Sequence, residues 1–216
     1  VTSIDAQGPH SVTVPGAIRA WHDLLAAHGR RGFAEVLKRA ISYARDGYPV
    51  APRVAHDWAL AVPKLAADPG ARDSYLFGGA APKAGDIVRQ PALARTLQKI
   101  ASEGPSGFYE GEVARDIVDT LAARGGLMSL DDLAGMTTLP MPPVIRSYRG
   151  IDVAELPPNG QGFIALVMLG LLERFDLASL DPLSATRFHL ELEAGRLAYS
   201  VRDLFLADPD HMQHGP

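Results

Sequence analysis

Residues 157–175 read Pro157-Pro158-Asn159-Gly160-Gln161-Gly162 followed by FIALVMLGLLERF, from Phe163 to Phe175. The two prolines stop an extended segment, and two glycines permit positive φ in a turn. The run that follows is apolar on nearly every side of a helix, which is typical of a helix surrounded by other elements. We therefore predict a turn at 157–162 and then a helix over 163–175 that is buried all round.

Two short strands are predicted before this turn. Apolar and polar residues alternate over 144–148 and again over 151–155, with Arg149-Gly150 between them. A period of two is typical of strands, and the prolines that flank these segments disfavour the middle of a sheet. Residues 136–158 are therefore expected to form a hairpin or sheet edge.

Most other segments have helical spacing, with apolar residues three and four positions apart. Helices are predicted after Gly16, Gly32 and Pro52, from Pro91, after Gly111, from Ser129, and over 184–205. The first two should form an αα-hairpin, residues 68–91 should be loop-like, and Asp132 should complete a capping box with Ser129. The predicted organisation is a helical region at 1–135, short strands at 136–158, and a buried helix with a long last helix at 159–216. The fold class is mainly α with a short β hairpin.

Composition excludes several classes of protein. The 216 residues are 47% hydrophobic and 21% charged, which supports a packed core, and the net charge of −4 argues against a nucleic-acid partner. Cysteine is absent, so disulfides and thiolate nucleophiles are excluded. No apolar run is long enough to span a membrane, and no signal peptide is visible. Because the chain begins at Val1 without Met and stops at Pro216, we expect it to be an excerpt of a longer protein.

Few residue patterns point to chemistry. His189 and Glu193 could share a helix face, but two ligands are too few for zinc, so an ordinary hydrogen bond is favoured and no metal site is predicted. Thr137-Thr138 is interpreted as structural, because a Thr nucleophile is usually a free N-terminal residue. Backbone N–H groups of the loop Asn159, Gly160, Gln161 and Gly162 could hold an anion or a substrate oxygen, although a plain turn with an Asn cap is favoured on residues alone.

Six segments in order resemble the γ-glutamyltranspeptidase (glutathione hydrolase) family of N-terminal nucleophile hydrolases and its acylase-like relatives. They are VTVPG at 12–16, AISYARDGYP at 40–49, FYEGEVA at 108–114, GLMSLDDLAG at 126–135, Tyr148-Arg149-Gly150 with PPNGQG at 157–162, and a last segment with His189, Glu193, Ala194, Arg202, Asp208 and Pro209.

The resemblance implies a precursor that cuts itself before a Thr, whose hydroxyl then attacks a γ-glutamyl amide and transfers the acyl group to water or an amino acid. It implies that this chain is the middle of the large subunit, part of an αββα sandwich, and that the catalytic small subunit of the same precursor is its partner. No catalytic residue of the family falls within the chain, which is expected to be inactive alone. The chemistry needs no cofactor, and the family implies a bacterial periplasmic or cytoplasmic location without deciding between them.

Two departures from the family pattern bear on specificity and local structure. The loop at 157–162 carries Asn-Gly-Gln-Gly where Ser-Ser or Ser-Gly is usual, a form closer to the acylase-like branch. Val201 replaces the usual Asp before Arg202, so a local Asp–Arg arrangement is predicted to be missing. The alternatives to a γ-glutamyl enzyme are an acylase-like amidohydrolase and a non-catalytic helical interaction module.

Overall fold

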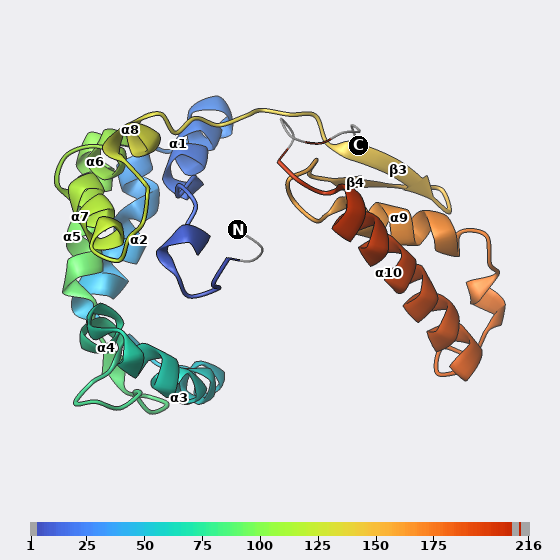
Figure 1. Ribbon diagram of the computed structural model, residues 1–216, viewed down its shortest axis with the longest axis horizontal. Coiled ribbons are helices and arrows are strands. Elements are labelled where there is room, and N and C mark those ends of the chain that lie inside the picture. The colour runs from blue at the N-terminus through green and yellow to red at the C-terminus, as the bar shows by residue number, and fades with distance from the viewer. Residues whose placement is uncertain (1–3, 209–211, 213–216) are drawn as a thin grey trace. The chain divides into compact units, whose positions relative to one another are not determined.

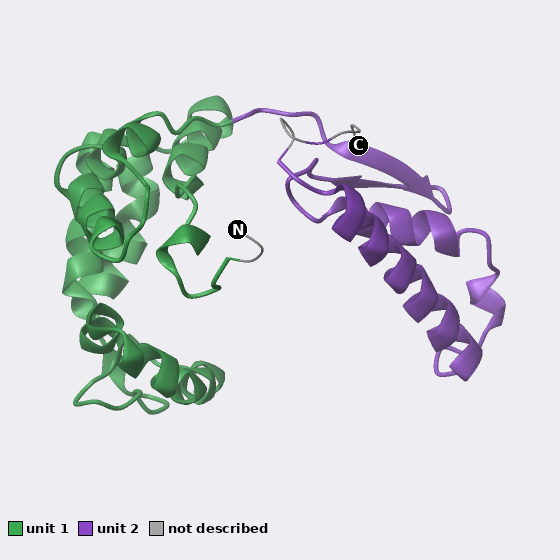
Figure 2. Cartoon of the chain, viewed as in Figure 1, with its two compact units in different colours: residues 1–138 green, residues 139–216 purple. Residues whose placement is uncertain are grey.

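The computed structural model describes residues 4–208 and 212 (Figure 1). The chain divides into two compact units, unit 1 at residues 1–138 and unit 2 at residues 139–216 (Figure 2). Within the described residues, no helix is both long enough and apolar enough to cross a bilayer.

Unit 1 is almost entirely helical. A short 3-10 turn, η1, covers Pro9–Ser11, and two two-residue strands, β1 at Tyr48–Pro49 and β2 at Ile87–Val88, pair antiparallel. The α-helices are α1 at Ala17–His28, α2 at Phe33–Asp46, α3 at Pro52–Ala67, α4 at Pro69–Tyr75, α5 at Pro91–Glu103, α6 at Ser106–Tyr109, α7 at Gly111–Ala122 and α8 at Leu130–Ala134. The predicted helices of this region are confirmed, and so is the capping box, in which Asp132 N–H bonds to Ser129 Oγ and Ser129 N–H to Asp132.

The prediction of a loop over 68–91 is wrong in part: residues 76–86 are loop-like, but a helix and a short strand flank them. Helix α4 begins there because the Asp68 carboxylate accepts a hydrogen bond from Ala71 N–H at 2.8 Å, and Pro69 has the fixed φ that suits the first helical position. Strand β2 forms because it pairs with β1, about forty residues earlier in the chain. No local sequence pattern could indicate this pairing. The glycines at 70, 78 and 79 had obscured both elements.

The predicted αα-hairpin is also wrong, because the main helical partner of α2 is α5 and not α1. Leu37 and Ile41 of α2 belong to the same apolar cluster as Leu97 and Ile100 of α5. The joint between α1 and α2 is short, but the widest apolar face of α2 meets a helix from later in the chain, and the area buried decides the packing.

Tyr109 lies at the centre of this core and is 1% exposed. Its hydroxyl donates to the Pro15 carbonyl at 2.6 Å and accepts from Arg19 N–H at 3.2 Å. A buried phenol needs such partners, and here they are backbone groups at the start of α1. One side chain of the FYEG segment therefore anchors the VTVPG segment, although about ninety residues separate them.

Unit 2 consists of a β-hairpin and two long helices. Strands β3 at Val144–Tyr148 and β4 at Ile151–Glu155 pair antiparallel, with Tyr148 opposite Ile151, so the predicted hairpin is confirmed. Helix α9 at Phe163–Leu172 packs against the hairpin and against α10 at Ala185–Phe205, as Figure 1 shows. A 3-10 turn, η2 at Leu177–Ser179, lies between the helices.

The prediction that α9 is buried all round is wrong for this chain. Ile164, Leu166 and Leu172 are buried, whereas Ala165 is exposed and the other residues of the helix are partly exposed. Within the described residues the helix is covered chiefly by the hairpin and by α10. Two covering elements cannot enclose a helix that is apolar on every side, so apolar surface remains open.

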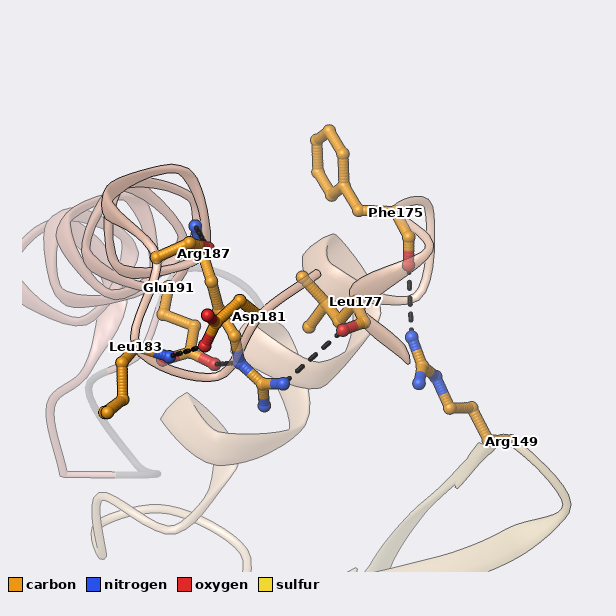
Figure 3. Close-up of polar contacts among 8 residues, drawn as sticks. Arg149, Phe175, Leu177, Asp181, Leu183, Arg187 and Glu191 are labelled. Atoms are coloured by element: carbon orange, nitrogen blue, oxygen red, sulfur yellow. Dashed lines mark hydrogen bonds and ion pairs between the residues drawn. The ribbon is translucent and has the colours of Figure 1, made fainter. Parts of the chain in front are cut away.

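Two arginines hold the connection between α9 and α10 (Figure 3). Arg149, at the hairpin turn, donates to the Phe175 carbonyl at 3.0 Å, and Arg187 of α10 donates to the Leu177 carbonyl at 3.4 Å while it pairs with Glu191 at 2.8 Å. The same two carbonyls also accept backbone N–H groups, from Leu177 at Phe175 and from Leu180 at Leu177. The two arginines therefore attach the connection to the hairpin turn and to α10.

Candidate functional site

The loop named from the sequence lies between the end of β4 and the start of α9. Asn159, Gly160 and Gln161 are exposed, and Gly162 is the N-terminal cap residue of α9. No side chain caps the helix, so the expected Asn cap is not formed. Neither glycine adopts the positive φ that was expected, and Gly162 has a φ of −57°.

The reason for a glycine at 162 is a close approach and not a special φ. A Cβ at this position would collide with the carboxylate of Glu155, the last residue of β4. The Glu155 carboxylate therefore lies beside the N-terminal end of α9, where the helix dipole favours negative charge. Charge repulsion from Glu155 opposes a second anion there and favours a neutral or cationic group.

Arg202, on the last helix, reaches this loop. Its Nη1 donates to the Gln161 side-chain oxygen at 3.2 Å, and its Nε and Nη2 donate to Asp203 Oδ1 at 2.8 and 2.6 Å. The prediction that a local Asp–Arg arrangement is missing is therefore wrong, because Asp203 after the arginine supplies what Val201 before it cannot.

A shallow pocket of about 350 Å³ adjoins the loop. Its walls are mostly apolar, and the polar side chains in its lining are Asn159 and Asp208. The apolar lining residues are Leu139, Met141, Leu156, Pro157 and Pro158. A pocket lined by five apolar residues, one amide and one carboxylate is suited to a group without negative charge that exchanges hydrogen bonds with Asn159.

The structure does not join His189 and Glu193. The Glu193 carboxylate accepts from Arg196 at 2.6 Å, and this hydrogen bond is the largest cause that lowers the pKa of Glu193. The hydrogen bond expected between His189 and Glu193 is replaced by this ion pair. Among the residues that the structure describes, no three His, Cys, Asp or Glu side chains gather as metal ligands; His211 and His214 lie outside them.

Thr138 contacts a carboxylate in unit 1. Its hydroxyl donates to Asp23 Oδ2 at 2.7 Å, and the other Asp23 oxygen lies 3.0 Å from His22 Nδ1. Hydrogen bonds with His22 and then Thr138 lower the pKa of Asp23. The Thr138 hydroxyl fastens the end of unit 1 to α1, which supports the structural interpretation of this threonine.

Sequence reasoning named the loop but missed its neighbours. Arg202 is about forty residues away in the chain, and Glu155 belongs to a strand, so neither has a local signal that points to the loop. Asp203 is adjacent to Arg202 in the sequence, but that the two pair depends on how the arginine side chain folds back along α10.

The model of the family described as Gamma-glutamyltranspeptidase matches residues 2–215. The chain is 36% identical over 199 residues to the glutathione hydrolase-like YwrD proenzyme of Bacillus subtilis. The aligned residues cover 92% of this chain and 38% of the relative. The chain is also 36% identical over 203 residues to the acylase ACY 1 proenzyme of Pseudomonas sp. strain SE83, covering 94% and 36% of the two chains.

The fold of the chain also matches part of a solved structure. Cephalosporin acylase from Bacillus halodurans aligns with a TM-score of 0.91 at 32% identity, over 98% of this chain and 40% of that chain. The mainly helical fold with two small two-stranded sheets is therefore part of an N-terminal nucleophile hydrolase fold. The chain spans less than two fifths of the length of the two curated relatives. From residue 2 to residue 215 it belongs to the gamma-glutamyltranspeptidase family.

Proposed function

We propose that this chain is the middle of the large subunit of an amide-cleaving enzyme, a γ-glutamyltransferase or glutathione hydrolase. In the whole enzyme, a Thr outside these residues would attack the amide carbonyl, form an acyl-enzyme and pass the acyl group to water or an amine. The chain would supply scaffold and one wall of the cleft. The match of the family over residues 2–215 is the observation that carries this proposal.

The open apolar surface of unit 2 supports a partner of the kind that the family implies. Ile145 and Ile151 of the hairpin are 59% and 69% exposed, and Leu156 at the end of β4 is 74% exposed. The strand register places Ile145 and Leu156 on one face of the hairpin and Ile151 on the other, near the turn. Exposed apolar side chains on a small hairpin are expected to be covered in the working assembly. The catalytic small subunit from the same precursor is the proposed cover, and this surface weighs against an independent helical module.

An acylase-like amidohydrolase is the second candidate. The identity to the acylase proenzyme equals that to the glutathione hydrolase-like proenzyme, at 36%. In addition, the Glu155 carboxylate beside α9 disfavours an anionic group at the loop, whereas a γ-glutamyl substrate carries a carboxylate. The two candidates share the Thr mechanism and differ in the acyl group that is bound.

The test is turnover by the complete gene product. We expect purified full-length protein to cut itself before a Thr and to release the amine from γ-glutamyl-p-nitroanilide or glutathione, or from a cephalosporin side-chain amide for the second candidate. Mass spectrometry should locate the acyl group on the new N-terminal Thr. Replacement of that Thr by Ala should abolish both cleavage and turnover.

The 216-residue chain is the matched control, and we expect it to be inactive on all of these amides. Turnover by the pure chain would contradict the proposal, since it would require a nucleophile within these residues. A complete gene product that neither processes itself nor cleaves any of the amides would favour the interaction module.

A further inference from the structure

The loop at 157–162 has a single side-chain tether. Within the described part of the chain, the bond from Arg202 Nη1 to the Gln161 oxygen, at 3.2 Å, is the only side-chain hydrogen bond made by this loop. The backbone bonds from Ile164 and Ala165 to the Gln161 and Gly162 carbonyls belong to the first turn of α9. The exposed tip of the loop therefore depends on a residue of the last helix for its orientation.

The Arg202 guanidinium also contacts two residues of its own helix. Two of its nitrogens donate to one oxygen of Asp203, and its guanidinium lies over the ring of Tyr199, 4.7 Å from the centroid. Its side chain is 30% exposed. A planar guanidinium fixed in this way holds its remaining N–H donors in set directions, which an ammonium on a flexible stem cannot do.

The orientation of the loop matters because Asn159, two residues before Gln161, lines the adjoining pocket together with Leu139, Leu156 and the carboxylate of Asp208. An Asn side chain offers one acceptor and two donors, the complement of a neutral amide. A shift of Gln161 would move Asn159 relative to the pocket walls.

We propose that Arg202 is a positioning residue, which holds the loop at 157–162 so that Asn159 can hydrogen-bond the neutral amide of an acyl-amide substrate in the adjoining pocket. Asp203 and Tyr199 fix the guanidinium that performs this task. The inference rests on the proposed function, since it assigns part of the substrate contact to this loop.

The test uses the complete gene product with Arg202→Met, Gln161→Leu and the double variant. Each single change should raise KM for the amide probe about tenfold, with kcat within about threefold, because a hydrogen bond to a charged group is lost from substrate positioning. The double variant should be no worse than either single one. Arg202→Lys, which keeps a positively charged donor group, should show only part of the loss.

Arg196→Met is the matched control. Arg196 lies on the same helix and, among the residues that the structure describes, pairs with Glu193 alone on the exposed surface, so its replacement should leave KM unchanged. Unchanged KM in both single variants would overturn the proposal. Effects that multiply in the double variant would also overturn it, because Arg202 would then act independently of Gln161.

Hydrogen–deuterium exchange on the 216-residue chain provides a test that needs no activity. Arg202→Met should speed exchange of backbone amides over 157–165, while Arg196→Met should not. Equal protection in both variants would overturn the proposal. Full-length protein that cleaves none of the amides would instead refute the proposed function, with the exchange result still deciding whether Arg202 holds the loop.

Discussion

Unit 1 and unit 2 bury their apolar residues to different degrees. The four largest fully buried side chains, Tyr109, Ile100, Leu133 and Val88, all lie in unit 1. Among the described residues of unit 2, the buried cluster consists of Leu172, Leu177 and Ala194, and Ile164, Leu166 and Ala198 are buried outside it. Unit 1 therefore has a large interior of its own, whereas unit 2 has a small one.

The difference is not one of hydrophobic content, because α9 is the most uniformly apolar helix of the chain and still buries only three side chains. Its surface exceeds what one hairpin and one helix can cover. Apolar surface left open is a cost until another element removes it from water. Unit 2 is therefore the unit whose stability should depend more on a partner, as the proposed small subunit would provide.

The largest effect is expected at the centre of unit 1. Tyr109→Ala should cost about 3–5 kcal/mol of unfolding free energy, because a cavity opens and the Pro15 carbonyl loses its donor. Urea unfolding followed by circular dichroism measures the cost. Tyr109→Phe should lose only about 1 kcal/mol, and Leu60→Ala, at a side chain 70% exposed, should change little. A small effect of Tyr109→Ala would refute a core centred on this residue.

A direct comparison of the units comes from the same substitution in each. Leu133→Ala in unit 1 should cost about 3–4 kcal/mol, and Leu172→Ala in unit 2 about 2 kcal/mol. Leu133 is 0% exposed inside the large cluster, while Leu172 is 8% exposed in the small one. Hydrogen exchange resolved by segment reports the two units separately. Equal losses would show that the interior of unit 2 is as well packed as that of unit 1.

Gly170→Ala probes a close contact between α9 and β3 in unit 2. A Cβ there would overlap the Arg146 guanidinium, the end of a flexible side chain, which would have to move away from Glu173. We therefore expect the gain from the better helix former to be cancelled, with a net change within about 1 kcal/mol of zero. Gly195→Ala on α10 is the control, since its Cβ would meet only Met168 at 3.6 Å. It should stabilise by about 0.5–1 kcal/mol. Thermal unfolding distinguishes the two, and in an Arg146→Ala background Gly170→Ala should stabilise as Gly195→Ala does.

The smallest effect concerns the cap of α8 in unit 1. Ser129→Ala should cost about 1 kcal/mol. Hydrogen bonds from the Ser129 backbone and side chain lower the pKa of Asp132 below 3.8, so the variant should raise that pKa part of the way back.

The pH dependence of this cap has a defined sign. Because the folded pKa of Asp132 is lowered, its stabilisation is complete above pH 3.8 and is lost as pH falls through the folded value. A carboxyl titration by NMR measures the pKa in both proteins. An unchanged pKa in Ser129→Ala would mean that the side-chain bond has no part in the shift.

Much of the fold was predictable from local patterns. Helix periodicity, the Ser129 cap and the strand alternation located most elements within a few residues, because each depends on neighbours in the chain. The candidate loop was found for the same reason, since two prolines and two glycines lie within six residues. Helix α4 escaped notice although Asp68-Pro69 is a recognisable start, because Gly70 resembled a helix breaker.

Sequence alone determined the mainly helical class, the hairpin before an apolar helix, and the resemblance to the family, since these follow from residue periodicity and short ordered motifs. Tertiary structure decided which faces meet: α2 on α5, the Tyr109 hydroxyl on Pro15, and Arg202 on Gln161. It also decided that the Glu155 carboxylate lies where a Cβ of residue 162 would be. The physical reason is that periodicity shows which side of an element is apolar, whereas packing over the whole chain selects the surface that covers it.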